Sequence, residues 1–329
     1  MLAIEDVATL LNTALRGDSE TNPCCTTLYI NEHDDEFSVV GSTIQSRRLG
    51  PRFVKFGTGG DSSIGTEMLH CEALGLNHLN AAAPSGILKV PRPVAVGKLP
   101  TGQSFIAMEQ LDIGPSKSGS SDPAAALGRG LAFMHRDRAA NGGHHGFGFP
   151  VDGCCGSHPQ PNAPEHFTNA SIRWDHFWQQ YRLGPQLEGC RRDSPQVYEL
   201  GQQVLKIVPE LFSGYGLRVE DIKPSILHGD LWGGNWSVDA KSGLPCIYDP
   251  AAYYGHSEAD LGIAKMFGGF TASFWAAYYE VLPKQPGHDH RSLLYEVHHH
   301  LNHLNMFGSG YESGCLRMFQ RILQELKQR

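Results

Sequence analysis

The sequence predicts an α+β fold with two lobes: an N-terminal antiparallel sheet plus one helix, then a larger, mainly helical C-terminal lobe. The chain of 329 residues is long for a single hydrophobic core. Short runs rich in Val, Ile, Phe and Tyr fill the first third, whereas apolar residues at helical spacing dominate the rest. We therefore place the lobes at residues 1–111 and 112–329.

The N-terminal lobe is expected to begin with an amphipathic helix and to continue as a sheet. The first 18 residues carry apolar side chains at helical spacing and lack the basic start of a signal peptide. Five runs are then predicted as strands: TTLYIN, EFSVVGS, RFVKFG, RPVAVGKL and SFIAMEQL. A helix at residues 62–82 interrupts them after the third strand, because Met68, Leu76 and Leu79 belong to one apolar row.

The C-terminal lobe is expected to follow a linker rich in Gly, Ser and Pro at residues 112–123. A helix then begins at Pro123, capped by Ser121 or Asp122, and ends near Arg138. Residues 141–166 are expected to be irregular, because Gly, His and Pro are frequent there. Further helices are predicted at 171–183, 194–212 (after the cap and proline pair Ser194-Pro195), 258–281, 288–306 and 311–327, and two short strands at NWSVD and PCIYD.

The composition argues against several classes of function. A net charge of −7 argues against nucleic acids or anionic membranes as main partners. No stretch approaches the ~20 apolar residues that a membrane span needs. The eight cysteines form no CxxC motif, so we expect reduced thiols and a cytoplasmic protein. The sequence predicts no particular oligomeric state.

The stretch LHGDLWGGNWSVDAKSGLPCIYDP, residues 227–250, carries the strongest chemical signal. Asp230 precedes Asn235 by the spacing of a kinase catalytic loop, with Gly229 where arginine is usual. Asp230 would accept the proton of an attacking hydroxyl, and Asn235 and Asp249 would hold Mg²⁺, which prefers oxygen ligands. The strand–turn–strand between Asn235 and Asp249 would bring the two ligands onto one ion. The alternative is that Asp230 and Asn235 are present only because Asp and Asn favour turns.

Other parts of a site for ATP are also present. Lys55 lies on the predicted third strand, where a phosphate-binding lysine belongs, and Glu67 or Glu72 on the following helix could pair with it. The turn VVGSTIQS would direct the backbone N–H groups of Gly41, Ser42 and Thr43 at phosphate oxygens. The segment AMEQL, residues 107–111, falls where an inter-lobe hinge would present backbone groups to adenine.

Several segments together resemble the fructosamine/ketosamine 3-kinases, relatives of the aminoglycoside phosphotransferases and choline kinases within the protein-kinase-like superfamily. They are HGDLWGGNW, YDPAAYYGHSEADLGIAKMFGGF, YYEVLP, HHLNHLNMFGSGY, CEALGLNHL, VPRPVAVG and HFWQQYRLGPQL. The likeness covers roughly residues 35–327. The HGDxxxxN spacing is common to many small-molecule kinases, whereas HGDLW combined with DPAxYYGHxExDL is more specific.

The resemblance implies a protein-kinase-like fold and ATP- and Mg²⁺-dependent phosphorylation of the sugar 3-hydroxyl of ketosamines, either small molecules or glycated proteins. The 3-phosphate would destabilise the adduct and release the free amine. By position, Asp230 would be the proton acceptor and Trp232 would pack on the sugar. Glu72 would pair with Lys55.

The resemblance also implies that Glu109, Gln110 and Leu111 line the adenine site. We group His228 with the substrate side, although we interpret it as holding backbone in place.

Departures and alternatives remain. The phosphate turn has Val40 before Gly41, where the family usually has paired glycines, and the 141–166 loop is longer and richer in His and Cys. A kinase for aminoglycosides, choline or another small alcohol is one alternative, and a non-catalytic nucleotide-binding pseudokinase is another. We expect the histidines at 298–303 to pack structurally and the Gly-rich residues 56–66 to be a loop, not a Walker motif. Glu258 and Asp260 are expected to support the catalytic loop.

Overall fold

The computed structural model describes residues 7–9, 37–40, 43–46, 50–57, 62–99, 102–114, 122–136, 146–163 and 172–327. Residues 7–9 are helical, as expected for the first helix. The predicted strand TTLYIN and most of the predicted linker lie outside the described residues.

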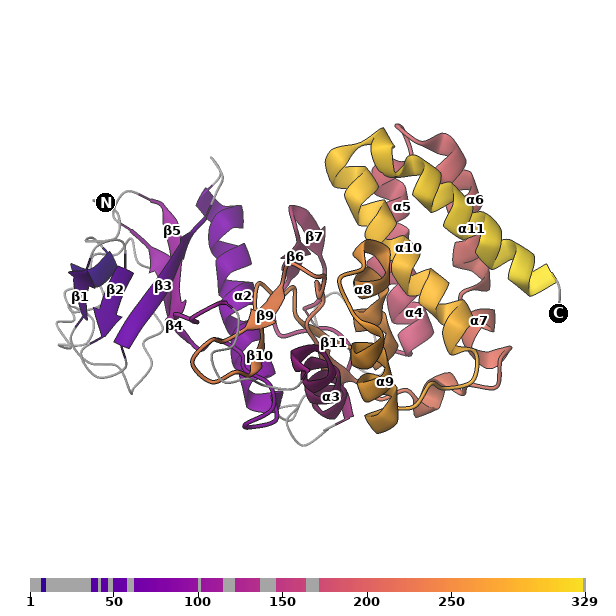
Figure 1. Cartoon of the computed structure of the whole chain (residues 1–329). Coiled ribbons are helices and arrows are strands. Elements are labelled where there is room, and N and C mark those ends of the chain that lie inside the picture. Colours follow the sequence, from indigo (N-terminus) through magenta and orange to yellow (C-terminus); the bar gives the residue numbers. More distant parts are fainter. Residues whose placement is uncertain are drawn as a thin grey trace.

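An antiparallel five-stranded sheet forms the N-terminal lobe (Figure 1), with strand order β1-β2-β3-β5-β4. The strands are β1 (Phe37–Val40), β2 (Thr43–Ser46), β3 (Gly50–Phe56), β4 (Pro93–Lys98) and β5 (Ser104–Glu109). Strand β2 was not predicted, because its sequence TIQS is polar and short. It pairs with β1 from Val40–Thr43 outward, so β1 and β2 form a hairpin.

One long helix, α2 (Ser62–Ala82), follows β3 and has the predicted bounds. Leu69, Leu76 and Leu79 are buried, and the helix packs against β4 and β5. Burial of this apolar row fixes the rotation of α2 about its axis. The rotation matters because α2 also carries Glu72 toward the cleft between the lobes.

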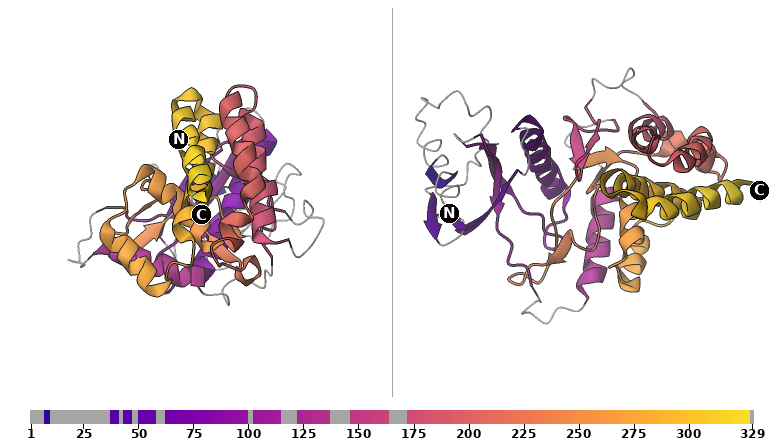
Figure 2. Two further views of the ribbon diagram at one scale, coloured as in Figure 1. Left: turned by 90° about the vertical axis from the view of Figure 1, so that its right-hand side faces the viewer. Right: turned by 90° about the horizontal axis from the view of Figure 1, so that it is seen from above.

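The C-terminal lobe is mainly helical, and its helices lie to one side of the sheet (Figure 2). Its helices are α3 (Pro123–Arg136), α4 (Trp174–Trp178), a π-helical turn (Gln179–Leu183), α5 (Gly184–Cys190), α6 (Pro195–Ile207), α7 (Glu210–Ser213), α8 (Gly262–Phe267), α9 (Ala272–Val281), α10 (His288–Phe307) and α11 (Glu312–Lys327). Helix α3 packs on α9, and α10 packs on α8 and α11.

Helix boundaries differ from prediction where glycine or proline intervenes. The single helix expected at 258–281 is a 3-10 turn, Ser257–Leu261, followed by α8 and α9, because Gly268 and Gly269 both have positive φ (68° and 87°). The helix expected at 194–212 is divided at Pro209 into α6 and α7.

The two predicted helix caps differ. The Asp122 side chain accepts a hydrogen bond from the Ala125 N–H at 3.0 Å, so the cap of α3 is confirmed at Asp122. Ser194 precedes Pro195 as expected but makes no side-chain capping bond.

Among the described residues, three two-stranded ribbons lie in the C-terminal lobe. The predicted pair is confirmed as β9 (Trp236–Val238) and β10 (Pro245–Ile247). A second pair, β8 (Ser225–Leu227) with β11 (Tyr253–Gly255), was not predicted. The expectation that residues 141–166 are irregular is wrong in part, because they contain the hairpin of β6 (Gly153–Cys155) and β7 (His158–Gln160).

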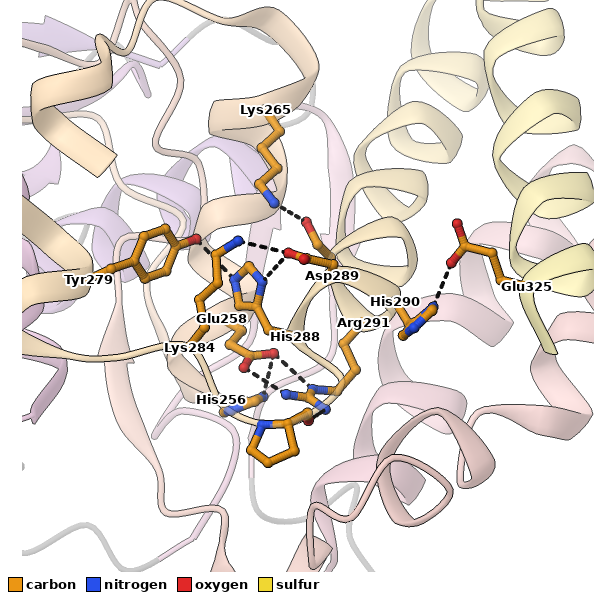
Figure 3. Close-up of polar contacts among 12 residues, drawn as sticks. His256, Glu258, Lys265, Tyr279, Lys284, His288, Asp289, His290, Arg291 and Glu325 are labelled. Carbon is orange, nitrogen blue, oxygen red and sulfur yellow. Dashed lines mark hydrogen bonds and ion pairs between the residues drawn. The ribbon is translucent and has the colours of Figure 1, made fainter. Parts of the chain in front are cut away.

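A buried ion pair lies within the C-terminal lobe (Figure 3). The Arg291 guanidinium donates to both carboxylate oxygens of Glu258 at 2.8 Å, and its side chain is fully buried. A two-pronged geometry of this kind is favourable for arginine and carboxylate. The pair ties α10 to the 3-10 turn before α8, the turn that also carries Asp260.

Among the described residues, no helix has the length and apolar character of a membrane-spanning segment.

We predict that Glu258→Gln lowers the free energy of unfolding by about 3–5 kcal/mol, because the charge of Arg291 stays buried without its partner. Chemical denaturation followed by circular dichroism measures the change. Glu280→Gln is the matched control, since Glu280 pairs with Arg129 at 4.0 Å on the surface and should change stability by no more than about 0.5 kcal/mol. Equal midpoints for the two variants would contradict the assigned role of the pair.

Candidate functional site

The loop that carries Asp230 makes a sharp turn at Gly229, directly after β8. Gly229 has a φ of 81°, and a Cβ atom there would collide with the carbonyl oxygen of Ala251. Only glycine combines a positive φ with so close a backbone approach. The glycine that replaces arginine in the kinase-like spacing is therefore required by the local backbone.

Asp260 holds this turn through the backbone. Its two carboxylate oxygens accept the N–H groups of His228 (2.9 Å) and Gly229 (2.7 Å), and one of them also contacts His135 Nε2 at 3.1 Å. The side chain of Asp260 is buried. Burial disfavours its charged form, but the bonds and charges around it prevail, and the pKa of Asp260 is lowered. This confirms the expectation that Asp260 supports the catalytic loop.

His228 is fixed by backbone on both ring nitrogens. Its Nε2–H donates to the Tyr248 carbonyl at 2.9 Å, and Nδ1 accepts the Asp230 N–H at 3.3 Å. Burial lowers the pKa of His228, which keeps the ring neutral. These contacts fit a structural role. Its assignment to the substrate side stays a prediction.

The structure brings Asp230, Asn235 and Asp249 together. The Asn235 side-chain amide donates to the Asp230 carbonyl (2.8 Å), to the Asp230 carboxylate (3.2 Å) and to the Asp249 carbonyl (3.4 Å). The β9–β10 hairpin returns the chain between them, and the Tyr248 N–H donates to the Asn235 carbonyl at 3.1 Å. The predicted convergence of an amide and two carboxylates is therefore present.

Asp249 has the only positive φ of a non-glycine residue in the described part of the chain, 56°. Such backbone costs energy for a residue with a side chain and is frequent at functional sites. The Asp249 carboxylate is half exposed and accepts a bond from the Lys55 amine at 3.2 Å. The strained turn thus directs an acidic group into the cleft between the lobes.

Lys55 joins the two lobes through carboxylates. Its amine contacts Glu72 at 2.9 Å as well as Asp249. Burial alone would lower the pKa of Lys55, but the attraction of the two carboxylates outweighs it and the pKa is raised, so the amine stays charged. Of the two glutamates considered from the sequence, the structure pairs Lys55 with Glu72, whereas Glu67 is exposed.

Two cavities meet at Asp230. The smaller, about 220 Å³, is lined by Lys55, Glu72, Asp230 and Asp249, with Gly156 at its edge. The larger, about 520 Å³, is lined by Asp230 and Gly156 again and by other side chains: Cys155, Ser157, Trp232, Ile263, Phe267, Asn302, His303, Met306 and Phe307. A group held in one cavity therefore lies next to a group held in the other, with Asp230 between them.

The β6–β7 hairpin, which the sequence did not reveal, forms part of the boundary. Its turn has Gly156 at a φ of 62°, and a Cβ atom there would lie 2.5 Å from the Met306 sulfur. Buried Asn302 on α10 donates to the Cys155 carbonyl at 3.2 Å and accepts from the Gln186 amide at 3.1 Å. These contacts join segments more than 100 residues apart. The one feature of the sequence that could have indicated these contacts was the pair of asparagines within HHLNHLN.

The remaining predicted nucleotide contacts are placed as follows. Glu109 ends β5, and its carboxylate pairs with Lys89 at 3.2 Å. Gln110 and Leu111 follow it in the irregular segment that leads to the second lobe. Thr43 begins β2, opposite Val40. Gly41 and Ser42 lie outside the described residues, so the phosphate turn stays a prediction.

The residues fit a magnesium ion better than a softer metal. Within the described ranges, no group of three or more His, Cys, Asp or Glu side chains could hold a metal. Magnesium usually takes one or two protein ligands and completes its shell with water and substrate phosphates. The Asp249 carboxylate and the Asn235 amide oxygen are suitable oxygen ligands for that arrangement.

The pKa of Asp230 is raised to about 7, mainly by burial; the hydrogen bond from Asn235 lowers it, and the charges of Asp249 and Asp260 contribute to the rise. The folded-state pKa is above the unfolded value, so this group stabilises the fold only at low pH. That stability is lost as the pH rises toward 7.

We therefore predict that, at pH 8 without magnesium, the free energy of unfolding of Asp230→Asn is higher than that of the wild type, by at most about 4 kcal/mol. Chemical denaturation measures the difference. The difference should shrink at pH 5, where less of the wild-type charge has to be buried. A variant equal to or less stable than the wild type at pH 8 would show that the ionised carboxylate is not strained.

Comparisons with known proteins assign the chain to one family. The fructosamine kinase family model matches residues 39–325. The chain is 42% identical over 297 residues to a chloroplastic protein-ribulosamine 3-kinase of Oryza sativa subsp. indica, covering 88% of this chain and 79% of the relative. It is 37% identical over 266 residues to the ketosamine-3-kinase of Mus musculus, covering 74% and 81%.

Solved structures agree on the fold. A structure from Thermobifida fusca, of a protein assigned to the fructosamine-3-kinases, is 28% identical with a TM-score of 0.68, covering 91% of this chain and 94% of that chain. The GDP complex of aminoglycoside 2'-phosphotransferase-IIIa is 14% identical with a TM-score of 0.50, covering 97% and 98%. The two-lobed protein-kinase-like fold is therefore confirmed, and the chain belongs to the fructosamine kinase family.

Proposed function

We propose that this chain is a ketosamine 3-kinase, which transfers a phosphoryl group from ATP to the 3-hydroxyl of a fructosamine or ribulosamine and thereby promotes removal of the sugar. Family membership and the names of the relatives support the reaction class. The observation that carries the proposal is that Asp230 lines both the cavity of Lys55 and Asp249 and the larger cavity beside it.

In this proposal the smaller cavity receives the phosphates of ATP. Lys55, held by Glu72, neutralises phosphate oxygens. Asn235 and Asp249 would hold Mg²⁺, which would supply further charge neutralisation at those oxygens. Glu109, Gln110 and Leu111 would present backbone groups to adenine, and Gly41, Ser42 and Thr43 would cover the phosphates.

The larger cavity receives the ketosamine, with Trp232 against the sugar. Trp232 is 41% exposed and contributes its ring to the cavity wall, which suits an aromatic platform. Asp230 orients the 3-hydroxyl and takes its proton as the hydroxyl oxygen bonds to the γ-phosphorus and the bond to ADP breaks. A pKa near 7 matches a proton acceptor at neutral pH. The product carries the 3-phosphate that destabilises the adduct.

Aminoglycosides are a less suitable acceptor. They carry several cationic groups, which acidic side chains normally recognise. Among the described residues that line the larger cavity, Asp230 is the one carboxylate. A non-catalytic pseudokinase is also less suitable as an explanation. The proposed metal ligands Asn235 and Asp249 and the phosphate-binding Lys55 are all present in the chain.

We also propose that the lobes divide at Leu111. The segment after β5 pairs with the second lobe: the Ala240 N–H donates to the Asp112 carbonyl at 2.6 Å, and the Gly114 N–H donates to the Val238 carbonyl at 3.1 Å. Residues from 112 onward are thus attached to the C-terminal lobe, which supports a hinge just before them.

The cytoplasm is the proposed compartment, based on the cysteine pattern. The cysteines that the structure describes are free thiols: Cys71, Cys154, Cys155, Cys190, Cys246 and Cys315. The plant relatives are named chloroplastic, so microscopy of a tagged chain is the direct test.

We predict that Asp230→Asn lowers kcat for phosphorylation of a fructosyl- or ribulosyl-amine by at least ~10²-fold, because the hydroxyl loses its proton acceptor. Thermal stabilisation by Mg-ATP should be retained. Asp221→Asn, at an exposed carboxylate, is the matched control and should keep wild-type turnover. Unchanged turnover in Asp230→Asn would remove Asp230 from the mechanism.

We further predict that Glu72→Gln lowers kcat/KM for ATP about 10- to 100-fold, since Lys55 loses a charged hydrogen-bond partner that positions it. Glu67→Gln, on the same helix but exposed, should behave as the wild type. Steady-state kinetics with varied ATP measures both. Equal losses in the two variants would point to a general effect on α2.

A further inference from the structure

Exposed aromatic side chains gather at the mouth of the larger cavity. The described residues contain five large hydrophobic side chains that are exposed, and three of them line this cavity: Trp232 (41%), Phe267 (43%) and Phe307 (66%). Exposed aromatic groups that concentrate in one place commonly mark a binding surface. The sugar platform assigned to Trp232 accounts for only one of the three.

The rings form a continuous strip. Trp232 and Phe267 are 6.0 Å apart between ring centroids, with an angle of 60° between the ring planes. Phe267 lies 4.9 Å from His303, and His303 lies 5.5 Å from Phe307. The strip therefore extends from beside Asp230 to the solvent edge of the cavity.

No positively charged side chain of the described residues would repel a single cation in this cavity. No lysine or arginine is among the described residues that line it, and Asp230 is its one carboxylate. Burial lowers the pKa of His303, so this ring is neutral at pH 7. His303 Nδ1–H donates to the His299 carbonyl at 2.9 Å, which leaves Nε2 as a hydrogen-bond acceptor.

A ketosamine brings a cation to this position. Its secondary amine is protonated at neutral pH and is attached to C1, two carbons from the C3 that carries the reacting hydroxyl. With that hydroxyl at Asp230, the amine lies within the same cavity. Asp230 is engaged by the hydroxyl, so another group must recognise the ammonium.

Resting on the proposed function, we propose that Phe267 and Phe307, together with Trp232, bind the protonated amine of the ketosamine and the carbon chain attached to it. Aromatic faces attract ammonium groups and also cover apolar chains. The rings then select ketosamines over neutral sugar derivatives, and the carbon chain leaves the cavity along Phe307.

The test compares two acceptors that differ in charge, N-butyl fructosamine and the matching 1-O-butyl fructose ether. For the wild type, the amine should have a KM about 3- to 30-fold lower than the ether, with similar kcat. Phe267→Leu and Phe307→Leu should each lose most of that preference through KM. Phe307→Lys should raise KM for the amine more than KM for the ether, because the added charge repels only the amine.

Phe133→Leu on α3 is the matched control, and it should keep the wild-type preference. Thermal unfolding establishes that each variant is folded; Phe307 is so exposed that its variants carry the test even if Phe267→Leu does not fold. An amine-to-ether ratio that is near one in the wild type, or unchanged in the Phe307 variants, overturns the inference alone. Failure of the wild type to phosphorylate either acceptor, with Mg-ATP still stabilising it, overturns the proposed function as well.

Discussion

The active-site geometry depends on one buried carboxylate that accepts two consecutive backbone N–H groups. Asp260 holds the backbone of His228 and Gly229 and also contacts His135 on α3. A carboxylate with three such partners is strongly held in its charged form. Because the chain turns at Gly229 under this constraint, the next side chain, Asp230, is directed into the cleft. The Glu258–Arg291 pair secures the 3-10 turn, Ser257–Leu261, that carries Asp260.

The position of Asp230 between two cavities links its energetics to its proposed chemistry. Burial and neighbouring carboxylates make its ionised form costly, as the pKa of about 7 shows. Perturbed acidic groups of this kind concentrate at catalytic sites. Lys55 and the strained Asp249 lie on one side, and an aromatic cavity lies on the other. A reaction between a charged nucleotide and an alcohol needs such a division between polar and apolar walls.

Much of this arrangement was predictable because its signals are local. The bounds of α2, the β9–β10 hairpin and the Asp230/Asn235/Asp249 spacing follow from periodicity and turn residues in continuous stretches. The pairs β8–β11 and β6–β7 were missed, since strands of three residues carry no readable alternation. Asn302 and Met306, about 150 residues away, hold the β6–β7 hairpin in place, and no local sequence pattern encodes such contacts. The break after α8 at Gly268 and Gly269 was missed, because the helical pattern on both sides of these glycines predicted one continuous helix.

The central claim is that the sugar 3-hydroxyl is presented to Asp230 while the nucleotide phosphates lie at Lys55 and Asp249. A crystal structure with a non-hydrolysable ATP analogue, magnesium and a ketosamine tests it most directly. We expect the 3-hydroxyl oxygen to lie within about 3 Å of an Asp230 oxygen and in line with the γ-phosphorus. A different hydroxyl at Asp230, or a ketosamine bound outside the larger cavity, would contradict it.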